Sequence, residues 1–362
     1  MTQITFDSIY NRLADLAASP HGASPDAIAE LALTLFKLQF DHVAPYQQYC
    51  IALRRTPDSV LQTADIPPLP TSAFKEFQLT SLPPGEQHHV FRSSGTTSAE
   101  TSEHHHSHSS LAHYQQLVLP WFQRHLLPDR NQITFINLMP CQQEAPHSSL
   151  AAMMQSVIQR YGTPGSRNLG FIDENHLWQL KPAVITTILH HQCRNGEPCL
   201  VSGTAFGFVE LLDHLAATQT HLTLPPDSRV METGGYKGRT RQLPKATLHN
   251  LITHHLGVPA SHIVSEYGMC ELSSQAYDRT IGSTNPRQFR FPPWCQVRLV
   301  EPGTNQSPAP SEPGLITLLD LANVRSVMAI QTGDLGVGNS HGFEILGRAT
   351  GATQRGCSLL QS

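Results

Sequence analysis

At residues 91–98 the sequence is FRSSGTTS, a cluster of small hydroxyl side chains around one glycine. Glycine lets backbone N–H groups approach an anion closely, and the hydroxyls can donate further hydrogen bonds to phosphate oxygens. A Walker A loop is excluded, because no Gly-Lys-Ser/Thr follows at the required spacing. The stretch predicts a phosphate-binding loop or an ordinary polar turn. In the first case the binding groups are Ser93, Ser94, Gly95, Thr96 and Thr97.

Composition limits the classes of protein to which this chain can belong. Its 362 residues suffice for one large body or two domains, and 39% hydrophobic with 14% charged residues is typical of a soluble protein. The formal net charge of −4 offers no basic field to nucleic acid. The N-terminal segment resembles no signal peptide, and no apolar stretch is long enough to span a membrane. We therefore expect a cytoplasmic protein.

Helix-like and strand-like patterns alternate along the chain, which favours an α/β fold. Ser24-Pro25 is typical of a helix start, and apolar residues at helical spacing predict another helix that Gly162 ends. After Phe291 the strand-like segments GLITLLDL and RSVMAI follow a proline-rich connection and predict a smaller antiparallel sheet. Short apolar runs predict buried strands at 133–138, 199–201, 230–231 and 263–264.

Three further motifs follow in order: SEYGMCE at 265–271, QTGD at 331–334 and GR at 347–348. With SSGTTS, they resemble the motifs of the adenylate-forming superfamily, which includes acyl-CoA ligases and luciferases. The resemblance implies a site for ATP and Mg²⁺. In the superfamily's pattern, Tyr267-Gly268 would contact the adenine, Glu271 would bind the metal and Asp334 would bind the ribose. Arg348 would lie at a hinge. One departure is Ser98, which stands where the superfamily usually has glycine.

The residue types suit this chemistry. Attack of a carboxylate on the α-phosphorus of ATP gathers negative charge, so catalysis consists mostly of positioning and charge neutralisation. Mg²⁺ prefers carboxylate and phosphate oxygens, which suits Glu271, and a carboxylate on two ribose hydroxyls suits Asp334. Outside the ordered set, the same two residues would be interpreted as an ion-paired strand end and a turn.

Three other segments resemble one branch of the superfamily, the LuxE-type acyl-protein synthetases. LPTSAFKEF (69–77) resembles their PxxxFKEF segment, and ETGGYKGR (232–239) resembles an element whose glycines, here Gly234 and Gly235, approach the nucleotide. RGCSL (355–359) resembles their C-terminal motif, whose cysteine, here Cys357, accepts the acyl group as a thioester. The partner that the resemblance implies is an acyl-accepting protein, such as an acyl reductase, and the substrate that it implies is a carboxylic acid of the fatty-acid class.

The resemblance also implies the domain organisation. We expect an adenylate-forming N-terminal domain over residues 1–346, with mixed sheets flanked by helices and a smaller antiparallel β subdomain over 291–346. The usual C-terminal small domain and its catalytic lysine are expected to be missing, because only a tail over 347–362 follows and no lysine occurs after Lys245. The candidates for the replacement cation are Lys75, Lys237, Arg239 and Arg348, with Lys237 ranked first.

The sequence leaves two alternative functions open. The chain is alternatively a ligase that loads CoA or a carrier-protein thiol, or a nucleotide-binding subunit with weakened catalysis.

The histidine-rich run 103–108 is interpreted as a polar loop instead of a metal site, and the pairs His190-His191 and His254-His255 as surface residues. Residues 338–342 match the GxSxG pattern of hydrolases, but a strand-like segment follows instead of a helix, which excludes a nucleophile elbow.

Overall fold

The computed structural model describes residues 4–18, 24–93, 101–235, 241–303, 306–309, 311–339 and 342–349. The chain forms two compact units. Unit 1 consists of Met1–Pro120, Gly268–Ala276 and Gln288–Ser362, and unit 2 of Trp121–Tyr267 and Tyr277–Arg287. The predicted domain boundary at residue 346 stays a prediction. Within the described residues, no helix has both the length and the apolar character needed to cross a membrane.

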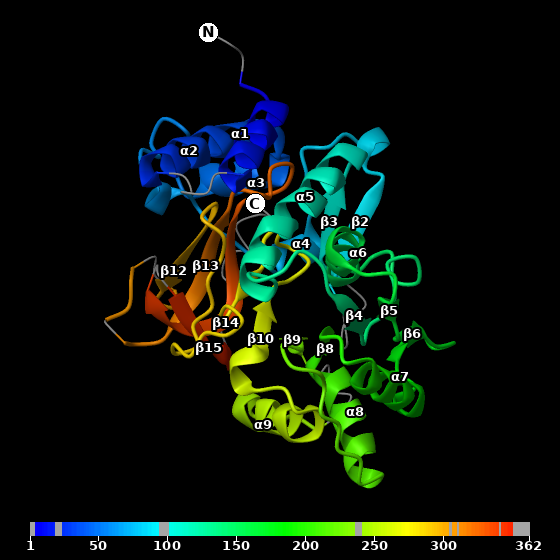
Figure 1. Ribbon diagram of the computed structural model, residues 1–362. Coiled ribbons are helices and arrows are strands. Elements are labelled where there is room, and N and C mark those ends of the chain that lie inside the picture. Colours follow the sequence, from blue (N-terminus) through cyan, green and yellow to red (C-terminus); the bar gives the residue numbers. More distant parts are fainter. Residues whose placement is uncertain are drawn as a thin grey trace. The chain divides into compact units, whose positions relative to one another are not determined.

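A six-stranded sheet forms the centre of unit 2 (Figure 1). Its order is β11-β10-β9-β8-β4-β5, and the pairs β10/β9, β9/β8, β8/β4 and β4/β5 are parallel. The strands are β4 (Thr134–Asn137), β5 (Arg167–Asn168), β8 (Cys199–Thr204), β9 (Arg229–Thr233), β10 (Ile263–Tyr267) and β11 (Ala276–Tyr277). All four strands predicted from apolar runs are confirmed.

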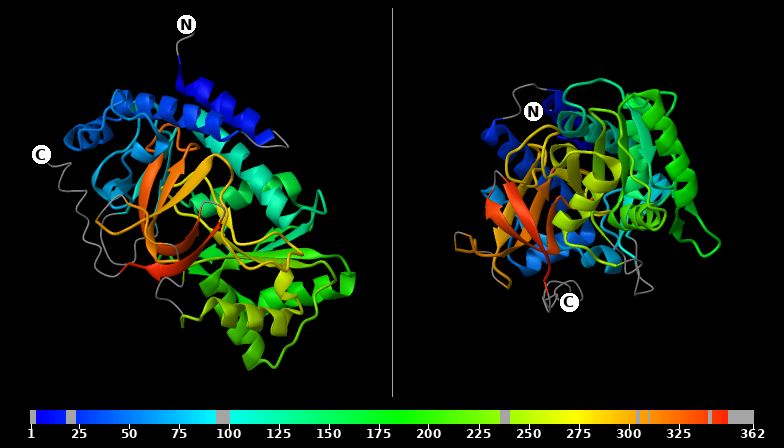
Figure 2. Two further views of the ribbon diagram at one scale, coloured as in Figure 1. Left: turned by 90° about the vertical axis from the view of Figure 1, so that its left-hand side faces the viewer. Right: turned by 60° about the horizontal axis from the view of Figure 1, so that its bottom comes forward.

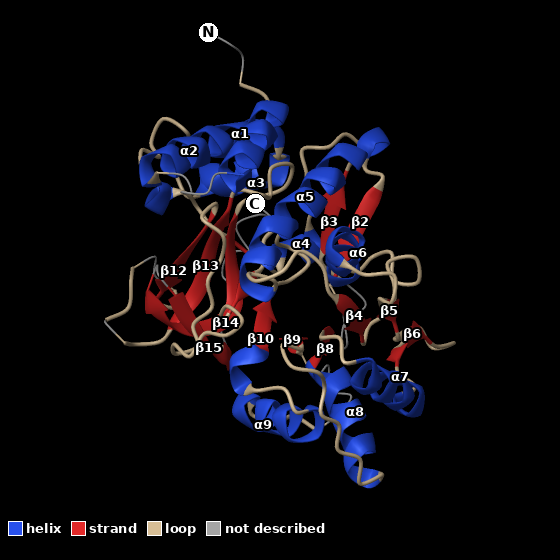
Figure 3. Ribbon diagram, in the orientation of Figure 1, coloured by secondary structure: helices blue, strands red, loops and turns tan. Residues whose placement is uncertain are grey.

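Helices pack on this sheet through apolar side chains. Leu189 of α7 (Pro182–Asn195), Leu212 of α8 (Ala205–Ala217) and Ile252 of α9 (Lys245–Leu256) join the strand residues Val201 and Val230 in one buried core. Figure 3 shows these three helices grouped on the same side of the strands. Each such buried side chain stabilises the fold by about 1.5–3 kcal/mol. Unit 2 also contains α6 (Ser149–Tyr161), η3 (Ala260–His262) and the pair β6 (Phe171–Ile172) and β7 (Trp178–Gln179).

The predicted end of α6 at Gly162 is confirmed, but for a different reason than a left-handed turn. Gly162 has φ −76°, which any residue can adopt. A Cβ atom at this position would lie 2.4 Å from the backbone oxygen of Ile158, which is too close for any side chain. Glycine is therefore required by close approach of the backbone. At the start of α6 the hydroxyl of Ser148 accepts a hydrogen bond from the N–H of Ala151.

A five-stranded sheet forms the centre of unit 1. Strands β12 (Cys295–Val300), β13 (Gly314–Asp320), β14 (Ala329–Asn339) and β15 (Gly342–Arg348) pair antiparallel, and β1 (Leu69–Pro70) pairs parallel with β14. The predicted antiparallel pairing of GLITLLDL with RSVMAI is confirmed, although β14 starts only at Ala329. The GxSxG pattern begins in β14 and ends in β15, so a strand follows it instead of the helix that a nucleophile elbow requires.

Helices at the N-terminus cover one end of this sheet. Figures 1 and 2 show α1 (Phe6–Ala18) and α2 (Pro25–His42) side by side there. The predicted helix start is confirmed, because the hydroxyl of Ser24 caps the N–H of Ala27. Buried Gln39 of α2 donates to the backbone oxygen of Asn323 and accepts from the N–H of Met328. These bonds fix the turn that leads into β14. The remaining helices are α3 (Ala44–Ala52), η1 (Thr63–Asp65), α4 (Ala73–Glu76), η2 (Pro84–Glu86) and α5 (His108–Leu126), which continues into unit 2.

The histidine-rich segment is a buried strand of unit 1, so the prediction of a polar loop over 103–108 is wrong. β3 (Glu103–His106) pairs antiparallel with β2 (His89–Arg92). The rings of His104 and His106 are only 2% and 3% exposed and lie 4.4 Å apart. Burial lowers the pKa of His104 to about 4 and also lowers that of His106. Neutral imidazole rings therefore pack as core side chains here.

We predict that this strand makes the fold sensitive to acid. The folded-state pKa of His104 is depressed from 6.5 to about 4, so the unfolded chain binds more protons between these values and stability falls as pH falls through them. At pH 5 the loss from His104 alone is about 2 kcal/mol relative to pH 7.5. Urea unfolding of the wild type and of His104→Asn, measured across this range, tests the prediction.

Asparagine keeps a donor near the position of Nδ1 but cannot be protonated, so the pH dependence of the unfolding free energy should become shallower in this variant. The exposed His190→Asn on α7 is the matched control and should retain the wild-type slope. An equally steep loss in His104→Asn would contradict the assignment.

Candidate functional site

The residues assigned to the site from the sequence are distributed over both units. Unit 1 contains Ser93, Gly268, Glu271, Asp334 and Arg348. Unit 2 contains Gly234, Gly235 and Tyr267. The positions Ser94, Gly95, Thr96, Thr97, Lys237 and Cys357 lie outside the described residues, so their roles stay predictions.

Asp334 and Arg348 face each other on the hairpin of unit 1. They are register partners on β14 and β15, and Nε of Arg348 lies 3.0 Å from Oδ1 of Asp334. The backbone N–H of Asp334 donates to the hydroxyl of Thr332, which donates to the backbone oxygen of Ile316. The guanidinium side chain is 82% exposed, whereas the carboxylate is only 12% exposed. The pair thus joins a largely buried carboxylate to a largely exposed guanidinium.

Close packing around Gly333 supports this hairpin. The N–H of Ala349 donates to the backbone oxygen of Gly333 at 2.9 Å. A Cβ atom at Gly333 would lie 3.6 Å from Nη1 of Arg348, so the guanidinium passes directly over this glycine. Residues Thr332 to Asp334 and Arg348 to Ala349 therefore form one connected element, which joins the two motifs that the sequence placed thirteen residues apart or more.

The segment that carries Glu271 is held by a buried carboxylate. Asp320, which is 0% exposed, accepts hydrogen bonds from the backbone N–H groups of Ser273 and Ser274 and from the hydroxyl of Ser274. It also accepts from the N–H of Ala322. Burial raises the pKa of Asp320, and these donors oppose the rise. Three of these four donors belong to Ser273 and Ser274, so the carboxylate fixes the turn between residues 271 and 274.

Two more side chains of unit 1 hold the same segment. Nδ2 of Asn323 donates to the backbone oxygen of Glu271 at 2.7 Å. Nδ1 of His104 lies 3.0 Å from the backbone oxygen of Cys270 and donates to it. No local sequence pattern marks Asp320, Asn323 and His104 as supports, because their role depends on contacts with residues far along the chain. The position of Glu271 is thus fixed through its backbone.

The carboxylate of Glu271 is 6% exposed, and the thiol of Cys270 donates to its Oε2 at 3.2 Å. Burial and the Glu271 charge raise the pKa of Cys270 well above its usual range, so this thiol stays protonated and is no nucleophile. A preorganised carboxylate with a second oxygen is a donor type that fits Mg²⁺. The residues present therefore fit the metal that the sequence predicts.

In unit 2, two buried glutamates lie near the carboxyl ends of the neighbouring parallel strands β9 and β10, at consecutive register positions and so on opposite faces of the sheet. Glu232 of β9 is the register partner of Ser265, and Glu266 of β10 is the partner of Thr233. Each carboxylate accepts from the hydroxyl of its partner, and Nε2 of His249 lies 3.2 Å from Glu232. Burial, with the Glu232 charge as a smaller cause, raises the pKa of Glu266 to about 7. The sequence signal for these two residues is a glutamate shortly after each apolar run and close to a glycine, as at Glu232 before Gly234 and Glu266 before Gly268.

The glycines and tyrosine of the predicted site follow directly from these strand ends. Gly234 and Gly235 come after β9, and Gly235 has φ +113°, a conformation that side chains other than hydrogen rarely allow. Tyr267 is the last residue of β10 and is half-buried. Ligands collect just beyond the carboxyl ends of parallel strands. The described geometry of unit 2 thus agrees with where a ligand is expected in an open α/β sheet.

Comparisons with known proteins agree on a family and a fold. The family model described as acyl-protein synthetase, LuxE, matches residues 16–362. An open conformation of 2-hydroxyisobutyryl-CoA ligase in complex with 2-HIB-AMP and CoA aligns with a TM-score of 0.59 and 12% identity, over 88% of this chain and 74% of that chain. The same ligase in the postadenylation state with 2-HIB-AMP aligns with a TM-score of 0.61 and 11% identity, over 90% and 68%. A search of the curated proteins found no match.

At these identities the solved structures show the fold, and the predicted α/β fold of an adenylate-forming enzyme is confirmed. The family match extends over more than half of the chain and includes the segments that carry the predicted motifs.

We predict that Glu266 destabilises unit 2 as pH rises. Its folded-state pKa of about 7 lies above the usual 4.5, so the folded chain binds more protons between these values and stability falls as pH rises through them. In Glu266→Gln, an acceptor oxygen remains for Thr233 but no charge forms. The variant should therefore gain about 2–3 kcal/mol over the wild type between pH 5 and pH 8 in urea unfolding.

The exposed Glu174→Gln in unit 2 serves as the control and should show no such relative gain. A constant difference between wild type and Glu266→Gln over this range would refute the raised pKa.

Proposed function

This chain belongs to the acyl-protein synthetase (LuxE) family, whose members are ATP-dependent, AMP-forming ligases, and we propose that it passes the activated acyl group to its own Cys357. The acid is activated as the acyl-adenylate with release of pyrophosphate. The observation that carries the proposal is that the family match runs to residue 362 and so includes the tail motif RGCSL with Cys357.

In the first half-reaction, a carboxylate oxygen of the acid attacks the α-phosphorus of ATP and the bond to pyrophosphate breaks. In unit 1, the resemblance assigns Asp334 to the two ribose hydroxyls, and the hydrogen bond of its backbone N–H to Thr332 supports a fixed position for it. The resemblance assigns Glu271 to Mg²⁺, and the buried bonds that hold its segment support this role. When bound, Mg²⁺ neutralises negative charge on the phosphates. Ser93 and the loop that follows it are assigned to the phosphates.

Tyr267 of unit 2, with Gly268 next to it in the sequence, is assigned to the adenine, and Gly234-Gly235 of unit 2 to close approach of the nucleotide. Lys237 remains our first candidate for the cation that neutralises the transition state, and Arg348 is the alternative that the described residues place beside Asp334. The desolvation free energy of an exposed guanidinium is small when it turns toward a phosphate.

In the second half-reaction, the thiolate of Cys357 attacks the acyl carbon, the bond to AMP breaks, and a thioester and AMP result. The proton of the thiol is released to solvent. We further propose a fatty acid as the substrate and a protein acceptor, such as an acyl reductase, for the thioester. Both follow from the branch of the superfamily that the segments 69–77 and 355–359 resemble.

A second candidate function has its own observation. The two solved structures with the similar fold belong to a CoA ligase, one of them in complex with CoA. In that case the acceptor is a diffusing thiol and Cys357 is idle. The third reading, a weakened nucleotide-binding subunit, is separated from both by whether the protein exchanges pyrophosphate into ATP with any acid.

We predict that Cys357→Ser separates the two half-reactions. With ATP, Mg²⁺ and labelled fatty acids of graded length, the wild type should acquire a hydroxylamine-sensitive label on a tail peptide. The variant should lose this label and still exchange pyrophosphate into ATP at a rate within about twofold of the wild type, because the thiol takes no part in adenylation.

Cys141→Ser, at a half-buried cysteine of unit 2, is the control and should keep the label. A labelled thioester in Cys357→Ser would move the acceptor elsewhere. A parallel reaction contains CoA as well. If Cys357→Ser forms labelled acyl-CoA there at the wild-type rate, the result favours the CoA ligase.

We also predict that Asp334→Asn weakens use of ATP. The change removes the charge from hydrogen bonds to the ribose, each worth about 1.5–3 kcal/mol when one partner is charged, so kcat/KM for ATP in pyrophosphate exchange should fall about 10–100-fold. Glu344→Gln, an exposed carboxylate on the neighbouring strand β15, should leave kcat/KM unchanged. An Asp334→Asn enzyme with wild-type kcat/KM and intact folding would remove Asp334 from the site.

A further inference from the structure

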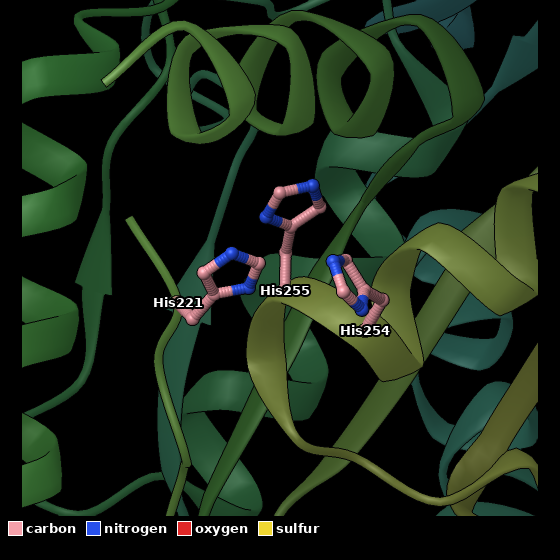
Figure 4. Close-up of side chains that lie close together, drawn as sticks. All are labelled: His221, His254 and His255. Carbon is pink, nitrogen blue, oxygen red and sulfur yellow. The ribbon is translucent and has the colours of Figure 1, made fainter. Parts of the chain in front are cut away.

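Three histidines of unit 2 gather at the C-terminal end of α9. His254 and His255 lie in the last turn of this helix, and His221 lies in the connection between α8 and β9. One ring nitrogen from each lies within 4.8 Å of the others. Figure 4 shows the rings of His221 and His254 on either side of His255. The prediction that His254-His255 is a surface pair is correct for His254 but wrong for His255, which is 5% exposed.

Backbone hydrogen bonds hold the two segments that carry the histidines together. The N–H of Leu222 donates to the backbone oxygen of His255 at 2.8 Å, and that of Leu224 donates to Leu256 at 3.0 Å. Gly257 adopts φ +70°, and a Cβ atom there would lie 3.0 Å from Cα of Thr223. The connection is therefore fastened to the end of the helix, and the histidines approach one another before any ligand binds.

The buried member of the cluster has a defined partner. Nδ1 of His255 lies 3.2 Å from the backbone oxygen of Thr220, and donation to this oxygen requires the hydrogen on Nδ1. The lone pair of the ring is then on Nε2. Histidines that bind metals almost always donate their other ring N–H to a carbonyl or carboxylate in this way, which fixes the ring and raises its basicity. Nε2 is therefore the nitrogen through which His255 can bind a metal.

Charge and ligand type also favour a cation. The last carbonyls of α9 give the helix end a partial negative charge, which stabilises positive charge nearby. The cluster offers imidazole nitrogens and no carboxylate, a set that suits Zn²⁺, Cu²⁺ or Ni²⁺ and disfavours Mg²⁺ and Ca²⁺. His221 and His254 are exposed, so their rings are free to turn.

The distances require a modest closure. Tetrahedral ligands at Zn–N distances of about 2.0–2.1 Å lie about 3.3 Å from one another, so nitrogens that are up to 4.8 Å apart must approach by an ångström or more. The competing explanation is ring stacking, since His221 and His255 lie nearly parallel at 5.1 Å between centroids. Stacking accounts for two of the rings, whereas His254 meets both of the others edge-on.

We propose that His221, His254 and His255 form a binding site for a divalent transition-metal ion, with Zn²⁺ as the suited ion and water in the fourth position. The ion joins the connection after α8 to the end of α9. Its effect is to stabilise unit 2, because an ion that binds only the folded chain shifts the folding equilibrium by mass action. The site is separate in sequence from every residue assigned to the ligase reaction.

The test uses the full chain after treatment with a chelator. ZnCl₂ is the ligand in the affinity and thermal measurements. Binding is measured by competition with a chromophoric chelator, and Co²⁺ is added in parallel for its visible absorption. The wild type should bind Zn²⁺ at this site, gain thermal stability with added Zn²⁺, and give the absorption of four-coordinate Co²⁺. His221→Ala and His254→Ala should each weaken the affinity about tenfold or more and abolish the thermal gain.

The control is His190→Ala, at an exposed histidine of the pair His190-His191 on α7. Its Zn²⁺ affinity and thermal gain should match those of the wild type. Both test positions are exposed, so loss of folding does not explain their effect. Wild-type affinity and thermal gain in either variant would overturn the proposal, and so would a wild type that binds no Zn²⁺. The measurement contains neither ATP nor acid, so its result is independent of the ligase activity.

Discussion

A buried carboxylate must be matched by hydrogen-bond donors, and in this chain the donors belong to the segments that carry the candidate site. Without donors, transfer of a carboxylate from water into the interior is far too costly. Asp320 takes its donors from Ser273 and Ser274, so the residues after Glu271 have one conformation that satisfies it. Glu232 and Glu266 take theirs from hydroxyls on the opposite strand. In each unit, the cost of burying charge is offset only when the functional segment is in place.

This constraint gives the two acidic residues of unit 1 different freedom. The backbone of Glu271 is held by Asn323, and its neighbours are held by Asp320 and His104, all within the core. Asp334 is fixed as firmly through Thr332, but its charge partner Arg348 is almost fully exposed. Ribose hydroxyls can donate to this largely buried carboxylate in place of Arg348, so the carboxylate keeps hydrogen-bond donors when the exposed guanidinium turns away. The arrangement suits a residue whose partner changes during a reaction cycle.

The sequence predicted best where one local pattern decides the structure. Apolar runs predicted the strands that became β4, β8, β9 and β10, and a serine before proline predicted the start of α2. It failed where burial depends on distant partners. The run at 103–106 is too polar to predict a core strand, yet neutral His104 finds an acceptor at Cys270. Asp320 gave no signal, because its donors lie about fifty residues earlier in the chain.

The position of Cys357 bears on whether the acceptor is this chain or a separate thiol. Residues 349–356 separate it from Arg348, and the nine steps of an extended chain from Arg348 to Cys357 span about 30 Å. A tethered group within such a reach has an effective concentration of the order of millimolar, whatever its concentration in solution. A diffusing thiol must be recognised by contacts of its own before it competes with one supplied at that concentration. Attack by the tethered thiol requires only that it reaches the acyl-adenylate as a thiolate, which makes Cys357 the simpler acceptor.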